Sequence, residues 1–165
     1  MVKKKSKIKS FLKKKENQFN LKLLLAFVFM VILDWATKFI VKRLNLNTYN
    51  KIVSITYTTN KGTLFGLFSN FEYINLIFII LSIIFLVLIF WFWTKEKDKS
   101  IPLLLVFSGI FSNLIDRLFY GSVVDWINVH FWPIFNIADS LIVIGVCWLI
   151  IIFLKEETNY KLKLN

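Results

Sequence analysis

The sequence is poor in the residues that build disulfides, metal sites and tight turns: among 165 residues it has one cysteine, one histidine, two prolines and five glycines. A lone cysteine, Cys147, excludes an intrachain disulfide and a cysteine-based metal cage. The shortage of histidine and cysteine also disfavours zinc, whereas a carboxylate-bound Ca²⁺ or Mg²⁺ stays open. No glycine-rich phosphate loop, internal repeat or low-complexity linker is present in the sequence.

Apolar residues dominate instead, at 57% of the chain with 19% charged, and the mean hydropathy is +0.64. They form long runs at residues 21–41, 74–93, 101–118 and 137–154. A helix needs about 20 residues to cross a hydrocarbon core of roughly 30 Å. The sequence therefore predicts an all-α membrane protein with four transmembrane helices, and excludes a disordered, collagen-like or ordinary soluble chain.

The net charge of +11 is concentrated in three places. Of the 21 basic residues, 15 lie before residue 23, in the connector 95–99 or after residue 154. Because Lys and Arg accumulate in short cytoplasmic segments, we predict that both termini and this connector are cytoplasmic. The first apolar run follows a basic segment, as in a signal peptide, but no small-residue cleavage site follows it. We therefore interpret that run as a retained first span.

The charge pattern also predicts the domain organisation. Residues 1–20 form a basic cytoplasmic extension, residues 21–157 a four-span domain and residues 158–165 a cytoplasmic tail. The lysine-rich extension is most simply a solvated, lipid-facing anchor, because aromatic residues that could stack on bases hardly interleave it. We predict contact with membrane lipids and no binding of nucleic acid.

This topology brings four carboxylates from distant parts of the chain to one membrane face: Asp34, Asp116, Asp125 and Asp139. The remaining six lie in the tails, the connector or the interface, where a charge costs little. The plainest interpretation is local pairing, of Asp34 with Lys38 and of Asp116 with its neighbour in sequence or another helix. No cation lies near Asp125 or Asp139 in the sequence, so these two are the stronger functional candidates.

Two carboxyl groups in a partly desolvated site do not both ionise easily. One keeps a proton, and the pair can then act as acid and base on a bound water, which is the chemistry of aspartic proteases. Nucleophilic catalysis by Ser or Cys is less favoured, because His130 would be the only histidine base and Cys147 lies deep in the fourth span. We interpret His130 as an interfacial aromatic residue.

The connectors at the predicted outer face contain a strand pattern. Residues 53–57 alternate β-branched or aromatic with polar side chains, which predicts a short amphipathic strand, followed by a turn at residues 60–62. With the apolar residues 64–68, this segment is either a surface that receives a peptide or lipid, or a short hairpin resting on the interface. Trp126 and Trp132 in the later connector are predicted interfacial anchors.

Four sequence blocks resemble the lipoprotein signal peptidase (signal peptidase II) family, in the family's order. Residues 34–38 (DWATK) resemble Asp-Gln-x-Thr/Ser-Lys, with Trp35 in place of the usual Gln. Residues 59–66 (TNKGTLFG) resemble Asn-x-Gly-Ala-Ala-Phe-Gly, with Thr63 and Leu64 replacing the alanines. Residues 108–117 (SGIFSNLIDR) resemble Gly-Gly-Ala-x-Gly-Asn-x-x-Asp-Arg, with Ser108 and Ser112 replacing glycines. Residues 121–126 (GSVVDW) and 135–140 (FNIADS) form the last block and match almost throughout.

The resemblance implies a membrane-embedded aspartic endopeptidase that cleaves lipidated prolipoproteins before the lipid-bearing cysteine, working as a monomer without metal or cofactor. It places the catalytic pair on Asp125 and Asp139. The supporting or substrate-binding residues that it implies are Asp34, Lys38, Asn60, Gly62, Asn113, Asp116, Arg117, Asn136 and Ala138. It also implies a small extracytoplasmic β-strand cradle between the first two spans. The residues alone leave two alternatives: a small carrier or channel whose carboxylates bind a cation or relay protons, and a non-catalytic membrane scaffold.

Overall fold

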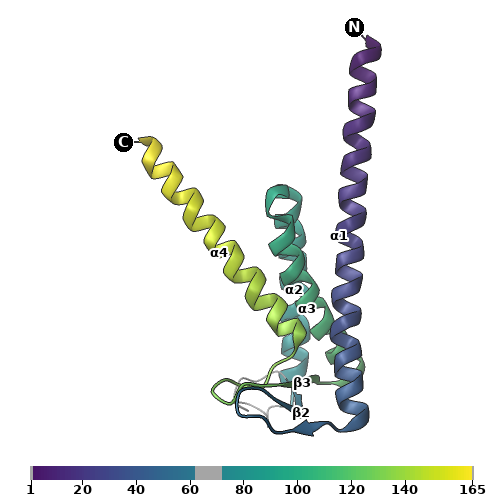
Figure 1. The fold of residues 1–165 in the computed structure, drawn as a ribbon, viewed down its shortest axis with the longest axis vertical. Helices are drawn as coiled ribbons and strands as arrows, with labels where there is room; N and C mark the ends of the chain where they lie inside the picture. Colours follow the sequence, from purple (N-terminus) through teal and green to yellow (C-terminus); the bar gives the residue numbers. More distant parts are fainter. Residues whose placement is uncertain (1, 62–71, 165) are drawn as a thin grey trace.

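The computed structural model describes the chain over residues 2–61 and 72–164, and the surroundings of side chains over residues 20–61 and 72–162. In this part of the chain, helices α1 (Val2–Leu44), α2 (Ile74–Lys95), α3 (Ser100–Tyr120) and α4 (Ile137–Leu164) stand on one side of a small sheet. The chain termini lie at the end of the helices opposite the sheet (Figure 1). All four helices contain a stretch long and apolar enough to cross a membrane, which confirms the predicted fold class.

The first and last helices are longer than their apolar runs. No proline or glycine interrupts residues 2–44, so the basic extension and the first span form one continuous helix. It ends at Leu44 and is followed by Asn45, whose φ of 46° lies in the left-handed region that asparagine tolerates after a helix. At the other terminus, α4 continues ten residues past the predicted end of its span at residue 154.

Helix α3 is the centre of the bundle. In its most apolar stretch 56% of the residues are buried, against 17% or less in the other three, whose apolar side chains face outward. Close packing of α3 on α4 depends on Gly109, because a Cβ there would lie 2.3 Å from the carbonyl oxygen of Ala138. Figure 1 shows α4 leaning away from the other helices as it runs from the sheet to the C-terminus.

The sheet has three antiparallel strands in the order β1 (Asn47–Thr48), β2 (Ser54–Asn60) and β3 (Val123–Asn128). The predicted strand at residues 53–57 is therefore placed correctly but is too short: β2 continues to Asn60, which was assigned to a turn. Strand β3 comes from the connector between α3 and α4, so the sheet joins both connectors at this end. Thr58 is paired with Asp125 in the register of β2 and β3.

Candidate active site

A buried lysine joins α1 and α3 at the sheet end of the bundle. The amino group of Lys38 on α1 lies 2.6 Å from Asp34 and 2.7 Å from Asp116 on α3, and it donates to Oδ1 of Asn113 at 2.9 Å. All four side chains are buried. The expected pairing of Asp34 with Lys38 is therefore present, and Asp116 pairs with this neighbouring helix.

Asp34 also binds the start of α4. Its Oδ1 accepts the backbone N–H of Ala138 at 2.8 Å, and its Oδ2 accepts the hydroxyl of Ser112 at 2.6 Å. The carboxylate thus satisfies one of the free N–H groups in the first turn of a helix, where negative charge is also favourable. Sequence reasoning noted Ser112 only as a departure from the family pattern, and its role as a hydrogen-bond donor to a distant helix was missed.

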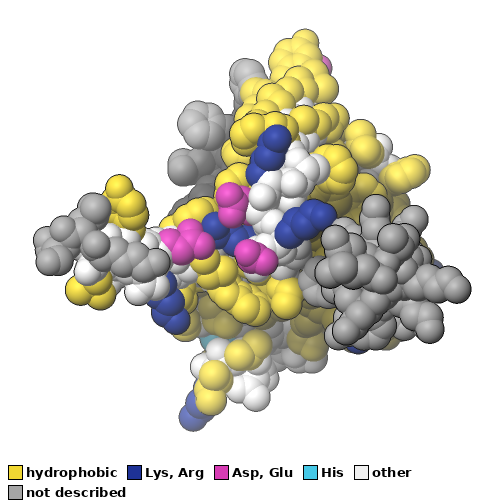
Figure 2. All heavy atoms as spheres, turned by 90° about the horizontal axis from the view of Figure 1, so that it is seen from above, with side chains coloured by type: hydrophobic (Ala, Val, Ile, Leu, Met, Phe, Trp, Pro, Cys, Tyr) yellow, Lys and Arg dark blue, Asp and Glu magenta, His cyan; other side chains and the backbone are white. Residues whose placement is uncertain are grey.

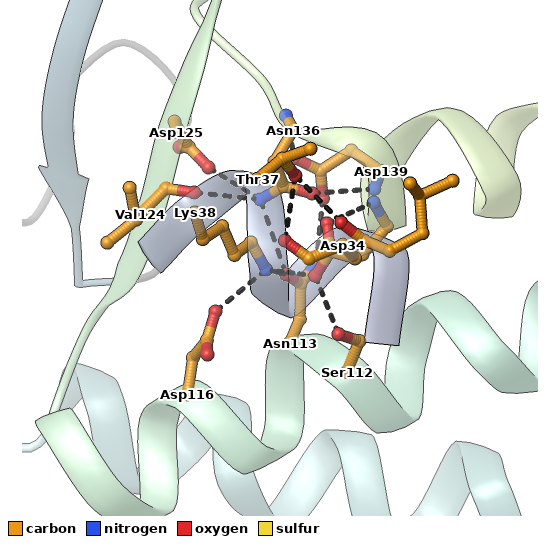
Figure 3. Close-up of polar contacts among 12 residues, drawn as sticks. Asp34, Thr37, Lys38, Ser112, Asn113, Asp116, Val124, Asp125, Asn136 and Asp139 are labelled. Atoms are coloured by element: carbon orange, nitrogen blue, oxygen red, sulfur yellow. Dashed lines mark hydrogen bonds and ion pairs between the residues drawn. The ribbon is translucent and has the colours of Figure 1, made fainter. Parts of the chain in front are cut away.

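Asn113 links this lysine cluster to the first candidate acid. Its Oδ1 accepts from Lys38, which fixes the orientation of the amide, and its Nδ2 donates to Oδ1 of Asp139 at 2.8 Å. Figure 3 shows the side chain of Asn113 pointing from α3 toward Lys38 and toward the start of α4. A change at the lysine is therefore transmitted to Asp139 through one side chain.

Asn136 holds both candidate acids. Its Nδ2 donates to Oδ1 of Asp125 at 2.8 Å, while its backbone N–H donates to Oδ2 of Asp139 at 3.2 Å. In return the backbone N–H of Asp139 donates to the Oδ1 of Asn136 at 2.9 Å. This reciprocal pair is a capping box at the first turn of α4. The residues that begin the helix therefore also position the two carboxylates (Figure 3).

Asp125 lies on β3, outside the spans, and accepts a hydrogen bond from a second side-chain amide. Asn60 at the end of β2 donates from Nδ2 to its Oδ2 at 2.9 Å, so both oxygens accept an uncharged donor. Burial and the nearby charge of Asp139 raise the pKa of Asp125 from 3.8 to about 6, although these two hydrogen bonds act in the opposite direction. A carboxyl with this pKa exchanges protons close to neutral pH.

Arg117 on α3 supplies a cation beside the two acids, and it interacts electrostatically with both. Its Nη1 donates to the carbonyl oxygen of Asn113 at 3.4 Å, and its guanidinium lies 5.1 Å from the ring centre of Phe78. The carbonyl of Arg117 accepts from Asn75 of α2, a contact that the sequence did not predict. This pairing ties α2 to the same region.

Ten of the eleven residues singled out in the sequence come together at this site, and Gly62 lies outside the described residues, as do Thr63 and Leu64. His130 contacts the loop before β2 and the first residue of that strand: its Nε2 is 2.9 Å from the carbonyl oxygen of Asn50 and 3.1 Å from Oγ of Ser54. Within residues 2–61 and 72–164, no group of three or more His, Cys, Asp or Glu could hold a metal ion.

The four apolar helices and the cluster of buried carboxylates at one end of them define a multi-pass membrane protein with an acidic site. The sequence pattern of the signal peptidase (SPase) II family matches residues 26–155. The chain belongs to this family of peptidases, which confirms the resemblance of the four blocks.

Individual relatives agree. The chain is 38% identical to a lipoprotein signal peptidase of Geobacter metallireducens over 141 residues, which cover 77% of this chain and 86% of that one. It is 35% identical to a lipoprotein signal peptidase of Borrelia hermsii, over 81% of this chain and 90% of the relative. A bacterial membrane enzyme solved in meso at 2.3 Å resolution is 32% identical, with a TM-score of 0.76 over 84% of this chain and 90% of that chain.

Proposed function

We propose that this protein is an aspartic endopeptidase that removes signal peptides from diacylglyceryl-modified prolipoproteins, cutting before the lipid-bearing cysteine. Asp125 and Asp139 are the catalytic residues of the proposal. The observation that carries it is the position of Asn136, which donates to one carboxylate through its side chain and to the other through its backbone. Family membership supports the substrate class, because the relatives are lipoprotein signal peptidases.

The proposed reaction needs one acid protonated and the other ionised. A pKa of about 6 lets Asp125 carry the proton for part of the time at neutral pH. The ionised acid takes a proton from a water molecule as the water oxygen attacks the scissile carbonyl carbon. At the same time the protonated acid gives its proton to the carbonyl oxygen. When the tetrahedral intermediate collapses, the C–N bond breaks, the acid that took the proton from water gives it to the leaving nitrogen, and a hydroxyl of the intermediate returns its proton to the other acid as the new carboxyl group forms. The pair is then again singly protonated.

The other polar residues have separate proposed roles. Asn60, Asn113 and Asn136 hold the acids in place through the hydrogen bonds described above. Arg117 and the amides bind the substrate backbone or stabilise the oxyanion of the intermediate, since preorganised donors act strongly in a dry site. The brace below the acids consists of Asp34, Lys38, Asp116 and Ala138. Gly62 completes the set of supporting residues on the resemblance alone.

The proposed orientation places both termini in the cytoplasm and the acids near the outer face. It rests on the charge distribution. Figure 2 views the molecule from the end opposite the sheet, and basic and acidic side chains gather in the middle of that face. There Lys99 is buried and pairs with Glu96 at 2.8 Å and with Glu156 of α4 at 3.1 Å. The enzyme would act as a monomer among membrane lipids, without a cofactor.

Cleavage of a lipidated prolipoprotein by purified variants tests the proposal. Asp125→Asn and Asp139→Asn should each reduce kcat by at least about 10³-fold, because neither amide can exchange the proton that the reaction needs. The matched control is Asp98→Asn, the same chemical change on an exposed carboxylate at the opposite end of the molecule, and it should leave the rate unchanged. Near-normal cleavage by either active-site variant would show that the pair is not catalytic.

A further inference from the structure

A hollow of about 270 Å³ lies between the sheet ends of α1 and α3, on the surface of the bundle. Its apolar wall consists of Trp35 and Phe39, one helical turn apart, whose rings stack at 5.6 Å. Both rings are about half exposed, at 46% and 54%, and Tyr120 from the last turn of α3 closes the other side. Apolar side chains exposed on a membrane-spanning helix face lipid chains.

Two cations without a carboxylate partner line the same hollow. Lys42 and Arg43 are exposed, and in the described part of the chain neither forms an ion pair. The amino group of Lys42 lies 4.5 Å from the ring centre of Tyr120. Asp116 also lines the hollow, but Lys38 already compensates its charge at 2.7 Å. The hollow therefore combines an excess of positive charge with aromatic rings.

We propose that this hollow binds the headgroup of an anionic phospholipid, with the phosphate between Lys42 and Arg43 and the acyl chains along Trp35 and Phe39. The cations lie in the last turn of the first span, at the level where a helix leaves the hydrocarbon core. Lys and Arg close to a membrane surface attract anionic headgroups, and aromatic rings are enriched at both membrane interfaces. A free anion would use only the cations and would leave the apolar wall without a role.

The bound lipid lies against the brace of the acidic site. Lys38 and Asp116 line both the hollow and the buried cluster, and Lys38 reaches Asp139 through Asn113. A lipid that binds only the folded protein stabilises it. Anionic phospholipid should therefore raise the thermal midpoint of the protein, and neutral phospholipid should do so less.

Native mass spectrometry of the detergent-purified full chain, titrated with phosphatidylglycerol or phosphatidylcholine, tests this proposal. We expect phosphatidylglycerol to bind at least tenfold more tightly, about the contribution of one charge-assisted hydrogen bond. The double variant Lys42→Gln/Arg43→Gln should lose this preference. The control Lys51→Gln/Lys155→Gln removes the same charge from exposed residues away from the hollow and should keep it.

Four results would overturn the proposal. Equal affinity for both lipids, or an unchanged preference in the Lys42→Gln/Arg43→Gln variant, would mean that the hollow does not select an anionic headgroup. Displacement of phosphatidylglycerol by an equal concentration of inorganic phosphate would mean that the site binds a free anion. A lower thermal midpoint in the double variant with unchanged lipid affinity would mean that the cations only compensate the C-terminal dipole of α1.

Discussion

Replacing Lys38 by methionine should strongly destabilise the protein, because one buried cation serves two buried carboxylates. Asp34 and Asp116 lie 2.6 Å and 2.7 Å from the amino group, and no more than 5% of any of the three side chains is exposed. Removing one partner of a buried ion pair costs about 3–5 kcal/mol, since the remaining charge has lost its solvation without compensation. We expect a loss of at least that size for Lys38→Met.

The chain offers a matched control with the same spacing and distance. Glu157 and Lys161 are also four residues apart on a helix, and their charged atoms also lie 2.6 Å apart, but both side chains are largely exposed. An exposed pair contributes about 0–1 kcal/mol, so Lys161→Met should have little effect. The two variants differ in burial and in the number of partners, not in local geometry.

Equilibrium unfolding of the purified proteins in a mixed micelle measures both losses. Adding Asp116→Asn to Lys38→Met should restore part of the stability, because one uncompensated buried charge is removed. A double-mutant cycle gives the coupling free energy between Lys38 and Asp116. A loss below about 1 kcal/mol for Lys38→Met, equal to that of Lys161→Met, would refute the argument that this lysine braces the site.

Three further predictions concern single groups of the same region. Ser112→Gly should destabilise by about 1–3 kcal/mol in the unfolding assay, because it removes the hydroxyl that donates to buried Asp34, while an equal loss in Ser112→Ala would assign the cost to the hydroxyl. Gly109→Ala should cost about 1–3 kcal/mol and reduce peptide cleavage, since its Cβ would collide with the carbonyl of Ala138; unchanged unfolding would contradict the close packing. Asp125→Asn should stabilise the protein at pH 7 by up to about 3 kcal/mol and not at pH 3, because a pKa raised from 3.8 to about 6 makes the native carboxyl destabilising as pH rises through that interval; the same gain at both pH values would contradict the raised pKa.

The sequence predicted the helices and the site for a physical reason. Long apolar runs without charge have to be buried in lipid. Asp34, Asp116 and Asp139 lie near the ends of such runs and Asp125 lies in a connector at the same membrane face, so the convergence of the four carboxylates followed from topology. Whether a given acid binds lysine or an amide depends on side-chain geometry. The pairing of Asp34 with Lys38 could be predicted because the two residues are four positions apart on one helix. The role of Asn136 depends on contacts between distant segments, so it came only from the family resemblance.

Other features have no local signal. Strand β3 (Val123–Asn128) is buried on both faces at its start and shows no alternation, so its pattern does not distinguish it from a connector. The hydroxyl of Ser112 acts on a residue 78 positions away, which no local rule can foresee. The lysine-rich start of α1 is helical as a continuation of the helix that forms the membrane span.

The capping box at the start of α4 links the stability of a helix end to the position of a carboxylate. The hydrogen bonds between Asn136 and Asp139 begin the helix and fix the carboxylate, so the first turn of α4 cannot fray without displacing the acid. If Asp139 is catalytic, as we propose, any change that loosens this turn, whether heat, detergent or a neighbouring substitution, should abolish activity before the bundle unfolds. Loss of cleavage activity would then report local unfolding of one helical turn.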